Sequence, residues 1–138
     1  MASFVLFQPF LANLFNGQNA PGADVIKLML SNTVPMITWG TFAQVPEIPA
    51  GAGYSAGGFP LTVVSSTQTG GIYTLVLQDT TLIATGIMAP WRWAIIYDAA
   101  KNTLIGYADN GVVISLDAGE LVNFHFDPIS GLIQAFPS

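Results

Sequence analysis

The stretch WRWAIIYDAAKNTLIGYAD, residues 91–109, contains the clearest pair of β-strand signals in the chain. Trp91–Tyr97 is a run of aromatic and aliphatic residues, and Thr103–Asp109 is a second apolar run. Between them, Asp98–Asn102 has the small and polar residues that turns prefer. The stretch therefore predicts two strands joined by a short turn.

Similar signals occur on both sides of this stretch. Asn110-Gly111 is a dipeptide that favours a hairpin turn. Further strands are expected at Asp24–Ser31, Phe59–Ser66, Ile72–Gln78, Thr81–Thr85, Val112–Leu116, Leu121–Phe126 and Leu132–Phe136. Many short strands separated by turn residues are typical of an all-β domain, either a β-sandwich or a jelly-roll-like one. We expect a single domain over residues 1–138, with an N-terminal helix or arm at 1–22 and the β-sandwich at 23–138.

The N-terminal segment has apolar side chains at helical spacing. The expected helix begins near Pro9 and ends at Asn16-Gly17. Its apolar positions are Phe7, Phe10, Leu11, Leu14 and Phe15. One interpretation is a helix that caps one end of the β core, which is the commoner role for such helices. The other is an arm, Phe4–Phe15, that docks on a neighbouring subunit.

Charge is scarce along the whole chain. Charged residues make up 8% of the sequence and apolar residues 51%, and the mean hydropathy is +0.55. Soluble domains have about 25% charged residues, and monomers rarely expose large apolar patches. The longest uncharged runs, 1–23 and 48–78, are interrupted by Pro, Gly and Asn, so neither predicts a membrane span. We therefore expect copies of the chain, or a larger assembly, to cover much of its surface.

Several other classes of protein are excluded by composition. The three basic residues, Lys27, Arg92 and Lys101, are scattered, whereas nucleic-acid binding needs clustered cations. The chain has no cysteine, which excludes disulfides, thiolate metal sites and cysteine nucleophiles. The N-terminus has no basic region and no clear cleavage site of a secretory signal, which predicts synthesis in a cytoplasm.

Residues able to perform chemistry are few. His125, the sole histidine, alternates with phenylalanines on an expected strand, where a surface or hydrogen-bonded role is commoner than metal binding. The eight acidic residues lie mostly at turns, where Asp accepts hydrogen bonds from nearby backbone N–H groups. Gly51–Gly58 lacks the Lys-Ser/Thr of a phosphate loop and predicts a tight structural loop. We expect no enzymatic activity, cofactor or metal; a hydrolase using His125 and a carboxylate is the enzymatic alternative.

Two further segments predict contact surfaces. On a regular strand, Trp91 and Trp93 point to one face and Arg92 to the other. A core or a subunit interface is the favoured interpretation, because Trp and Arg are enriched in interfaces. A carbohydrate-binding or host-adhesion module that stacks a sugar on both rings is the alternative. The long irregular segment 32–58 is expected to add interface residues around Trp39 and Phe42.

Residues 51–136 resemble a family of small virion proteins from tailed bacteriophages. Four boxes in order carry the resemblance: Gly53–Gly58 (GYSAGG), Ala84–Gly86 (ATG), Ala94–Asp98 (AIIYD) and Leu104–Asp109 (LIGYAD). The N-terminal helix followed by Asp24–Leu30 (DVIKLML) extends the resemblance over nearly the whole chain. The chain departs from the family's pattern in its scarcity of charge and in the segment MAPWRW, residues 88–93.

The resemblance implies a structural protein of the virion. The first implied role is a head decoration (cement) protein that is made in the host cytoplasm and binds the major capsid protein on the capsid surface. A tail component is the second. A homotrimer is expected, because trimers suit the three-fold positions of a capsid. The expected interface residues are Phe4, Phe7, Phe10, Trp39, Phe42, Trp91, Arg92 and Trp93.

Overall fold

The computed structural model describes residues 4–18, 20, 23–126 and 133–135. Strands dominate this part of the chain, which has one α-helix, α1 (Gln8–Phe15), and one 3₁₀ turn, η1 (Phe42–Gln44). The prediction of an all-β fold with a short N-terminal helix is confirmed. Helix α1 has Pro9 in its first turn and ends before Gly17, which has a left-handed φ of +74°.

The largest sheet has five antiparallel strands in the order β1-β8-β7-β2-β3. Their bounds are β1 Phe4–Leu6, β2 Ile26–Ser31, β3 Phe59–Leu61, β7 Trp91–Asp98 and β8 Thr103–Ile114. The predicted turn between β7 and β8 is present. It is held by Asp98, whose Oδ1 accepts hydrogen bonds from the backbone N–H groups of Ala100 at 3.0 Å and Lys101 at 3.1 Å. In the order given above, β7 is the central strand of the sheet.

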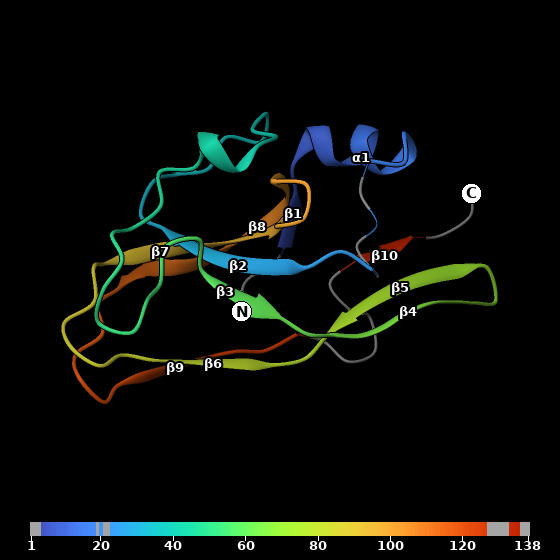
Figure 1. Cartoon of the computed structure of the whole chain (residues 1–138). Coiled ribbons are helices and arrows are strands. Elements are labelled where there is room, and N and C mark those ends of the chain that lie inside the picture. The colour runs from blue at the N-terminus through green and yellow to red at the C-terminus, as the bar shows by residue number, and fades with distance from the viewer. Residues whose placement is uncertain (1–3, 19, 21–22, 127–132, 136–138) are drawn as a thin grey trace.

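Two smaller sheets accompany the large one. Their strands are β4 Val63–Thr69, β5 Ile72–Leu77 and β10 Ile133–Ala135 in one sheet, and β6 Thr80–Ile83 and β9 Leu121–Phe124 in the other. In Figure 1 the β6–β9 pair lies beneath the large sheet, and α1 and η1 lie above it. The β4–β5 hairpin projects to one side of this layered body (Figure 1). Its Gly70-Gly71 turn has positive φ angles of +60° and +84°, which suit a tight hairpin.

Both faces of the central strands are buried. Leu28 and Ile96 are paired across β2 and β7 and lie in one core cluster, whereas their neighbours Met29 and Ile95 are paired and lie in the other. Successive residues of a strand point to opposite faces, so the two clusters occupy the two faces of the sheet. The first also contains Leu82 from β6. Burial on both sides explains why β7 is almost continuously apolar.

Three predictions of local structure need correction. Asn110-Gly111 does not form a hairpin turn, because β8 runs on without reversal to Ile114. The segment expected as one strand, Phe59–Ser66, is divided between β3 and β4, which belong to different sheets. Phe4–Leu6, expected within the N-terminal arm, forms β1 and pairs with β8 of the same chain. The expected strand Leu132–Phe136 is described only at 133–135, where β10 lies.

The glycine-rich segment is a structural loop that packs against the chain itself. Glu47 accepts hydrogen bonds from the Tyr54 hydroxyl and from the backbone N–H of Gly57, at 2.7 Å for the latter. The Tyr54 hydroxyl also accepts a bond from Leu30 N on β2 at 3.1 Å. Burial, with Glu47 nearby, raises the pKa of Tyr54, so this hydroxyl keeps its proton. The loop is thereby held against strand β2 of the large sheet.

Gly58 provides a direct test of this packing. Its φ is +81°, and a Cβ there would lie 1.9 Å from the Leu28 carbonyl oxygen, whereas Gly70 has a φ of +60° with nothing within 4 Å of an added Cβ. We expect Gly70→Ala to lower the free energy of unfolding by about 1–2 kcal/mol, the cost of a left-handed alanine. Gly58→Ala should cost several times more, because strand β2 must also move. Urea unfolding measures both, and equal losses would contradict the close approach.

Candidate interaction surface

Strand β8 has a large bulge opposite Arg92. Trp93 pairs with Asp109 and Trp91 pairs with Ile114, so the single residue Arg92 opposes residues 110–113 of β8. Gly111, inside the bulge, has a φ of +91°, a conformation that favours glycine. The Asn-Gly dipeptide is therefore used to make a bulge and not a chain reversal.

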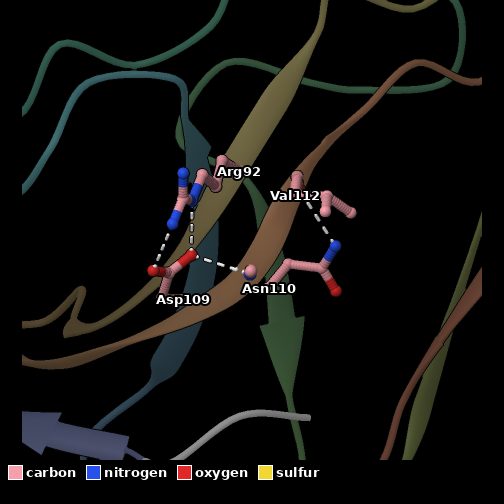
Figure 2. A network of polar contacts seen from close by, with 5 residues as sticks. Arg92, Asp109, Asn110 and Val112 are labelled. Carbon is pink, nitrogen blue, oxygen red and sulfur yellow. Dashed lines mark hydrogen bonds and ion pairs between the residues drawn. The ribbon is translucent and has the colours of Figure 1, made fainter.

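An ion pair fixes the bulge in place. The Asp109 carboxylate accepts two hydrogen bonds from Arg92, from Nε at 2.7 Å and from Nη2 at 2.9 Å. Its Oδ1 also accepts a bond from the backbone N–H of Gly111 at 2.8 Å, and Asn110 Nδ2 donates to the Val112 carbonyl at 3.1 Å. Figure 2 shows these contacts converging on the strand. The hydrogen bonds and opposite charges raise the pKa of Arg92 and lower that of Asp109.

The bulge also separates the two tryptophans. Trp91 lies in the core cluster of Ala94 and Ile96. Trp93 lines a cleft together with Tyr107, which packs on the cluster at the opposite face of the sheet. The prediction that both rings point to one face is therefore wrong, because the bulge interrupts the alternation of side chains between them.

Beside the ion pair lies an open cleft of about 510 Å³. The lining residues are Val5, Val34, Arg92, Trp93, Tyr107, Asp109 and Gly111. The Arg92 Cζ lies 5.0 Å from the centroid of the Trp93 ring, in cation–π contact. Apart from Arg92 and Asp109, which neutralise each other, the lining has no charged side chain.

Exposed apolar side chains lie on the lining of this cleft or next to its lining residues in the sequence. Val34 on its lining is 66% exposed, and Val112, next to Gly111 in the bulge, is 64% exposed. Val113 and Met36, close to them in sequence, are also more than half exposed. We call the cleft and the side chains of Val34, Val112 and Val113 the apolar rim. Such a surface, built around a neutralised ion pair, fits a macromolecular contact better than a small charged ligand.

The predicted interface residues fall into two groups. Phe7 packs in one core cluster with Trp39 and Phe42 at its margin, and Phe10 and Trp91 pack in the other with Phe4 at its margin. Within the chain Phe7 and Phe10 are fully buried, as expected of a helix that caps the core. Arg92 and Trp93 line the cleft. No sequence pattern predicted a role for Val34, Val112 or Val113, because their exposure depends on the bulge and the loop beside it.

The tryptophan side chains do not form an exposed sugar-stacking platform. Trp91 is 2% exposed and packs on Phe124, with ring centroids 5.8 Å apart. Trp93 is also buried, beneath the Arg92 guanidinium. Stacking a sugar needs an accessible ring face, and neither ring offers one in this structure.

His125 meets a carboxylate, as the enzymatic alternative requires. Its Nδ1 lies 2.7 Å from Asp79 Oδ2, while Asp79 Oδ1 accepts a bond from the backbone N–H of Phe126 at 2.7 Å. The backbone bond, followed by the histidine contact, lowers the pKa of Asp79. More than half of each of the two side chains is exposed, and His125 lines none of the described clefts. The pair is therefore in contact with water, which weakens the electrostatic interactions that a catalytic pair uses in a site without water.

Within the described residues, no three side chains of His, Asp and Glu come together where they could hold a metal ion. No helix in this part of the chain has the length and hydropathy required to span a membrane.

No protein-family model, curated protein or solved structure matches the chain. The resemblance to phage virion proteins stays a prediction.

The Arg92–Asp109 pair gives the stability a defined dependence on pH. The pKa of Asp109 is lowered in the folded chain, so its contribution is present above about pH 4 and is lost as the pH falls through the folded pKa. We expect the difference in melting temperature between the wild type and Asp109→Asn to shrink from pH 6 to pH 2. Asn110→Ala, which removes an uncharged bond of the same bulge, should give a difference that does not follow this titration. If the melting-temperature differences of both variants changed with pH in the same way, the pH dependence could not be assigned to the Arg92–Asp109 pair.

Proposed function

We propose that the chain is a non-enzymatic structural subunit that associates with copies of itself and with a larger assembly through its uncharged surfaces. The apolar rim is the observation that supports this proposal most strongly. It combines exposed aliphatic side chains with the Arg92–Asp109 pair, which holds the bulge in a fixed shape. A preorganised surface loses little conformational entropy when a partner binds.

The energetics favour burial of such surfaces. Besides the apolar rim, Phe15 on α1 is 85% exposed and Ile87 is 84% exposed. Burial of apolar surface contributes about 25 cal/mol per Å², and a standard protein interface buries about 1,600 Å². Translational and rotational costs offset much of this gain. Few charged groups have to be desolvated here, so a larger share of the gain remains.

The resemblance to tailed-phage virion proteins supports a more specific proposal. We infer that the assembly is a phage head, that the partner is the major capsid protein, and that the subunit acts as a decoration protein in trimers. A cement protein buries apolar area across the joints between capsid subunits, and a small gain per copy is multiplied around the shell. The net charge of −5 suits the outer surface, away from packaged DNA.

Light scattering coupled to size exclusion tests the self-association. The chain mass is 14.6 kDa, and we expect a particle of three times that mass that persists on dilution to micromolar concentration. A homogeneous particle of 14.6 kDa at all concentrations would overturn the self-association.

Charged substitutions test the role of the apolar rim. We expect the double variant Val34→Lys and Val112→Lys to raise the concentration needed for association by at least tenfold, because two ammonium groups would have to be desolvated. Val25→Lys introduces one charge at another exposed valine and is the control for Val34→Lys and Val112→Lys each made alone. Analytical ultracentrifugation measures the shift. Equal effects of the rim and control variants would exclude the rim from the contact.

A further inference from the structure

A second surface, separate from the apolar rim, lies between two sheets. It is a groove of about 300 Å³ that follows strand β6 on one side and reaches Phe59 and Pro60 of β3 on the other. Its lining has no charged residue, and Gly53 and Gly58 contribute no side chains to it. Both β3 and β6 are outer strands of their sheets within the described residues. The groove is therefore bordered by two strand edges.

The backbone of β6 faces this groove with unpaired groups. Ala84 N donates to Glu120 O at 2.9 Å, just past the ladder in which Leu82 pairs with Val122 and Thr81 with Asn123. In an antiparallel pair, residues that hydrogen-bond to the partner strand alternate with residues that do not. Because Ala84 is bonded to Glu120, Leu82 is bonded to Val122 of β9. The N–H and C=O groups of Thr81 and Ile83 therefore point away from β9. In the described part of the chain, no backbone group is bonded to these four groups.

The position of Gly53 supports this orientation independently. A Cβ on Gly53 would lie 2.6 Å from the carbonyl oxygen of Ile83, and Thr85 N donates to Ala52 O at 3.0 Å. The Ile83 oxygen therefore points away from β9, and the glycine loop covers it at this end of the edge. By the two-residue period of a strand, the backbone groups of Thr81 point the same way. The outward groups that remain open, the N–H and C=O of Thr81 and the N–H of Ile83, are a short template for another extended strand. The uncharged walls suit a strand without charged side chains.

We infer that the groove binds a strand of a second copy of this chain, by addition of that strand to the free edge of β6. This inference rests on the proposed self-association. Among the chain's own strands, β4 has the required chemistry: it spans Val63–Thr69 without a charged residue or proline and is the outer strand of its sheet. It lies on the hairpin that projects from the body in Figure 1, where it can reach a neighbour.

This contact also has a consequence for symmetry. Strand β4 of one copy and the groove of the next are different surfaces, so the contact is heterologous. Such contacts form a closed ring when the rotation between copies allows closure, and an open fibre when it does not. A ring of three copies satisfies every groove and every β4 edge. The proposed trimer would then be a ring in which each copy contributes β4 to the groove of the next.

Cysteine cross-linking tests which strands meet, since the chain has no cysteine of its own. An equimolar mixture of Thr81→Cys and Thr67→Cys, one substitution in β6 and one in β4, is treated with a short thiol cross-linker. We expect a covalent dimer in the mixture at a yield at least fivefold above that of either variant alone. A mixture of Thr81→Cys with Val25→Cys is the control. Dimer formation by Thr81→Cys alone would show β6 pairing with itself and overturn the assignment to β4.

Proline substitutions test the edge itself. Thr81→Pro removes the N–H that points into the groove, whereas Asn123→Pro removes the one that points to the outer edge of β9, and both lose the Thr81–Asn123 side-chain bond. Circular dichroism first establishes that both variants are folded. We expect the mass of Thr81→Pro to fall to 14.6 kDa and that of Asn123→Pro to stay at the wild-type oligomer mass.

The other outcomes separate the two proposals. A wild-type oligomer that Thr81→Pro leaves intact would overturn the role of the groove and leave the proposed self-association standing. Loss of the oligomer in both proline variants would also overturn the role of the groove, because the effect would not depend on which edge of the β6–β9 pair is changed. A monomeric wild type would overturn the self-association and this inference together.

Discussion

Burial of the central sheet on both faces is the constraint on which the rest of the structure depends. Strand β7 has neighbours on both sides and core clusters above and below, so nearly every residue from Trp91 to Asp98 is enclosed. Covering two faces takes much of a chain of 138 residues. The segment around η1 covers one face, with Phe42 at the margin of its core cluster. Strands β6 and β9 cover the other face, whose cluster also contains Phe10 of α1 (Figure 1). Few residues are left to form a second, polar layer over the segments that cover the sheet. The outer surfaces of these segments therefore carry exposed apolar side chains.

The places where the sheet ends its regular pairing are the places with binding potential. At one end of β7, four residues of β8 leave the ladder, and the Arg92–Asp109 pair holds them in a bulge that presents Val112 and Val113 to solvent. At the edge of the β6–β9 pair, the backbone groups of Thr81 and Ile83 have no strand beside them in the described chain. One surface offers apolar side chains and the other offers backbone hydrogen bonds. Together they give a chain with little charge two different means of association.

Periodicity and turn residues predicted much of the fold, and local signals failed where tertiary pairing decides. The helix at Gln8–Phe15 and the strands around Ile26–Ser31, Ile72–Leu77 and Trp91–Asp98 follow from spacing alone. The dipeptide Asn110-Gly111 led to a wrong prediction of a hairpin turn, because a glycine with a left-handed φ is suited to a bulge as well as to a hairpin. The opposite directions of Trp91 and Trp93 could not be predicted, since a bulge depends on the partner strand. The free edge of β6 likewise depends on sheet order, which the sequence pattern does not contain.

Hydrogen exchange of the backbone amides at two protein concentrations shows whether copies of the chain cover the uncharged surfaces. Above the association concentration, we expect slower exchange at Thr81 and Ile83 and in the bulge at 110–113. Amides inside the large sheet, such as that of Ile95, should exchange equally slowly at both concentrations. Exchange that is independent of concentration at Thr81, Ile83 and the bulge would contradict self-association through these surfaces, since they would then stay open to water.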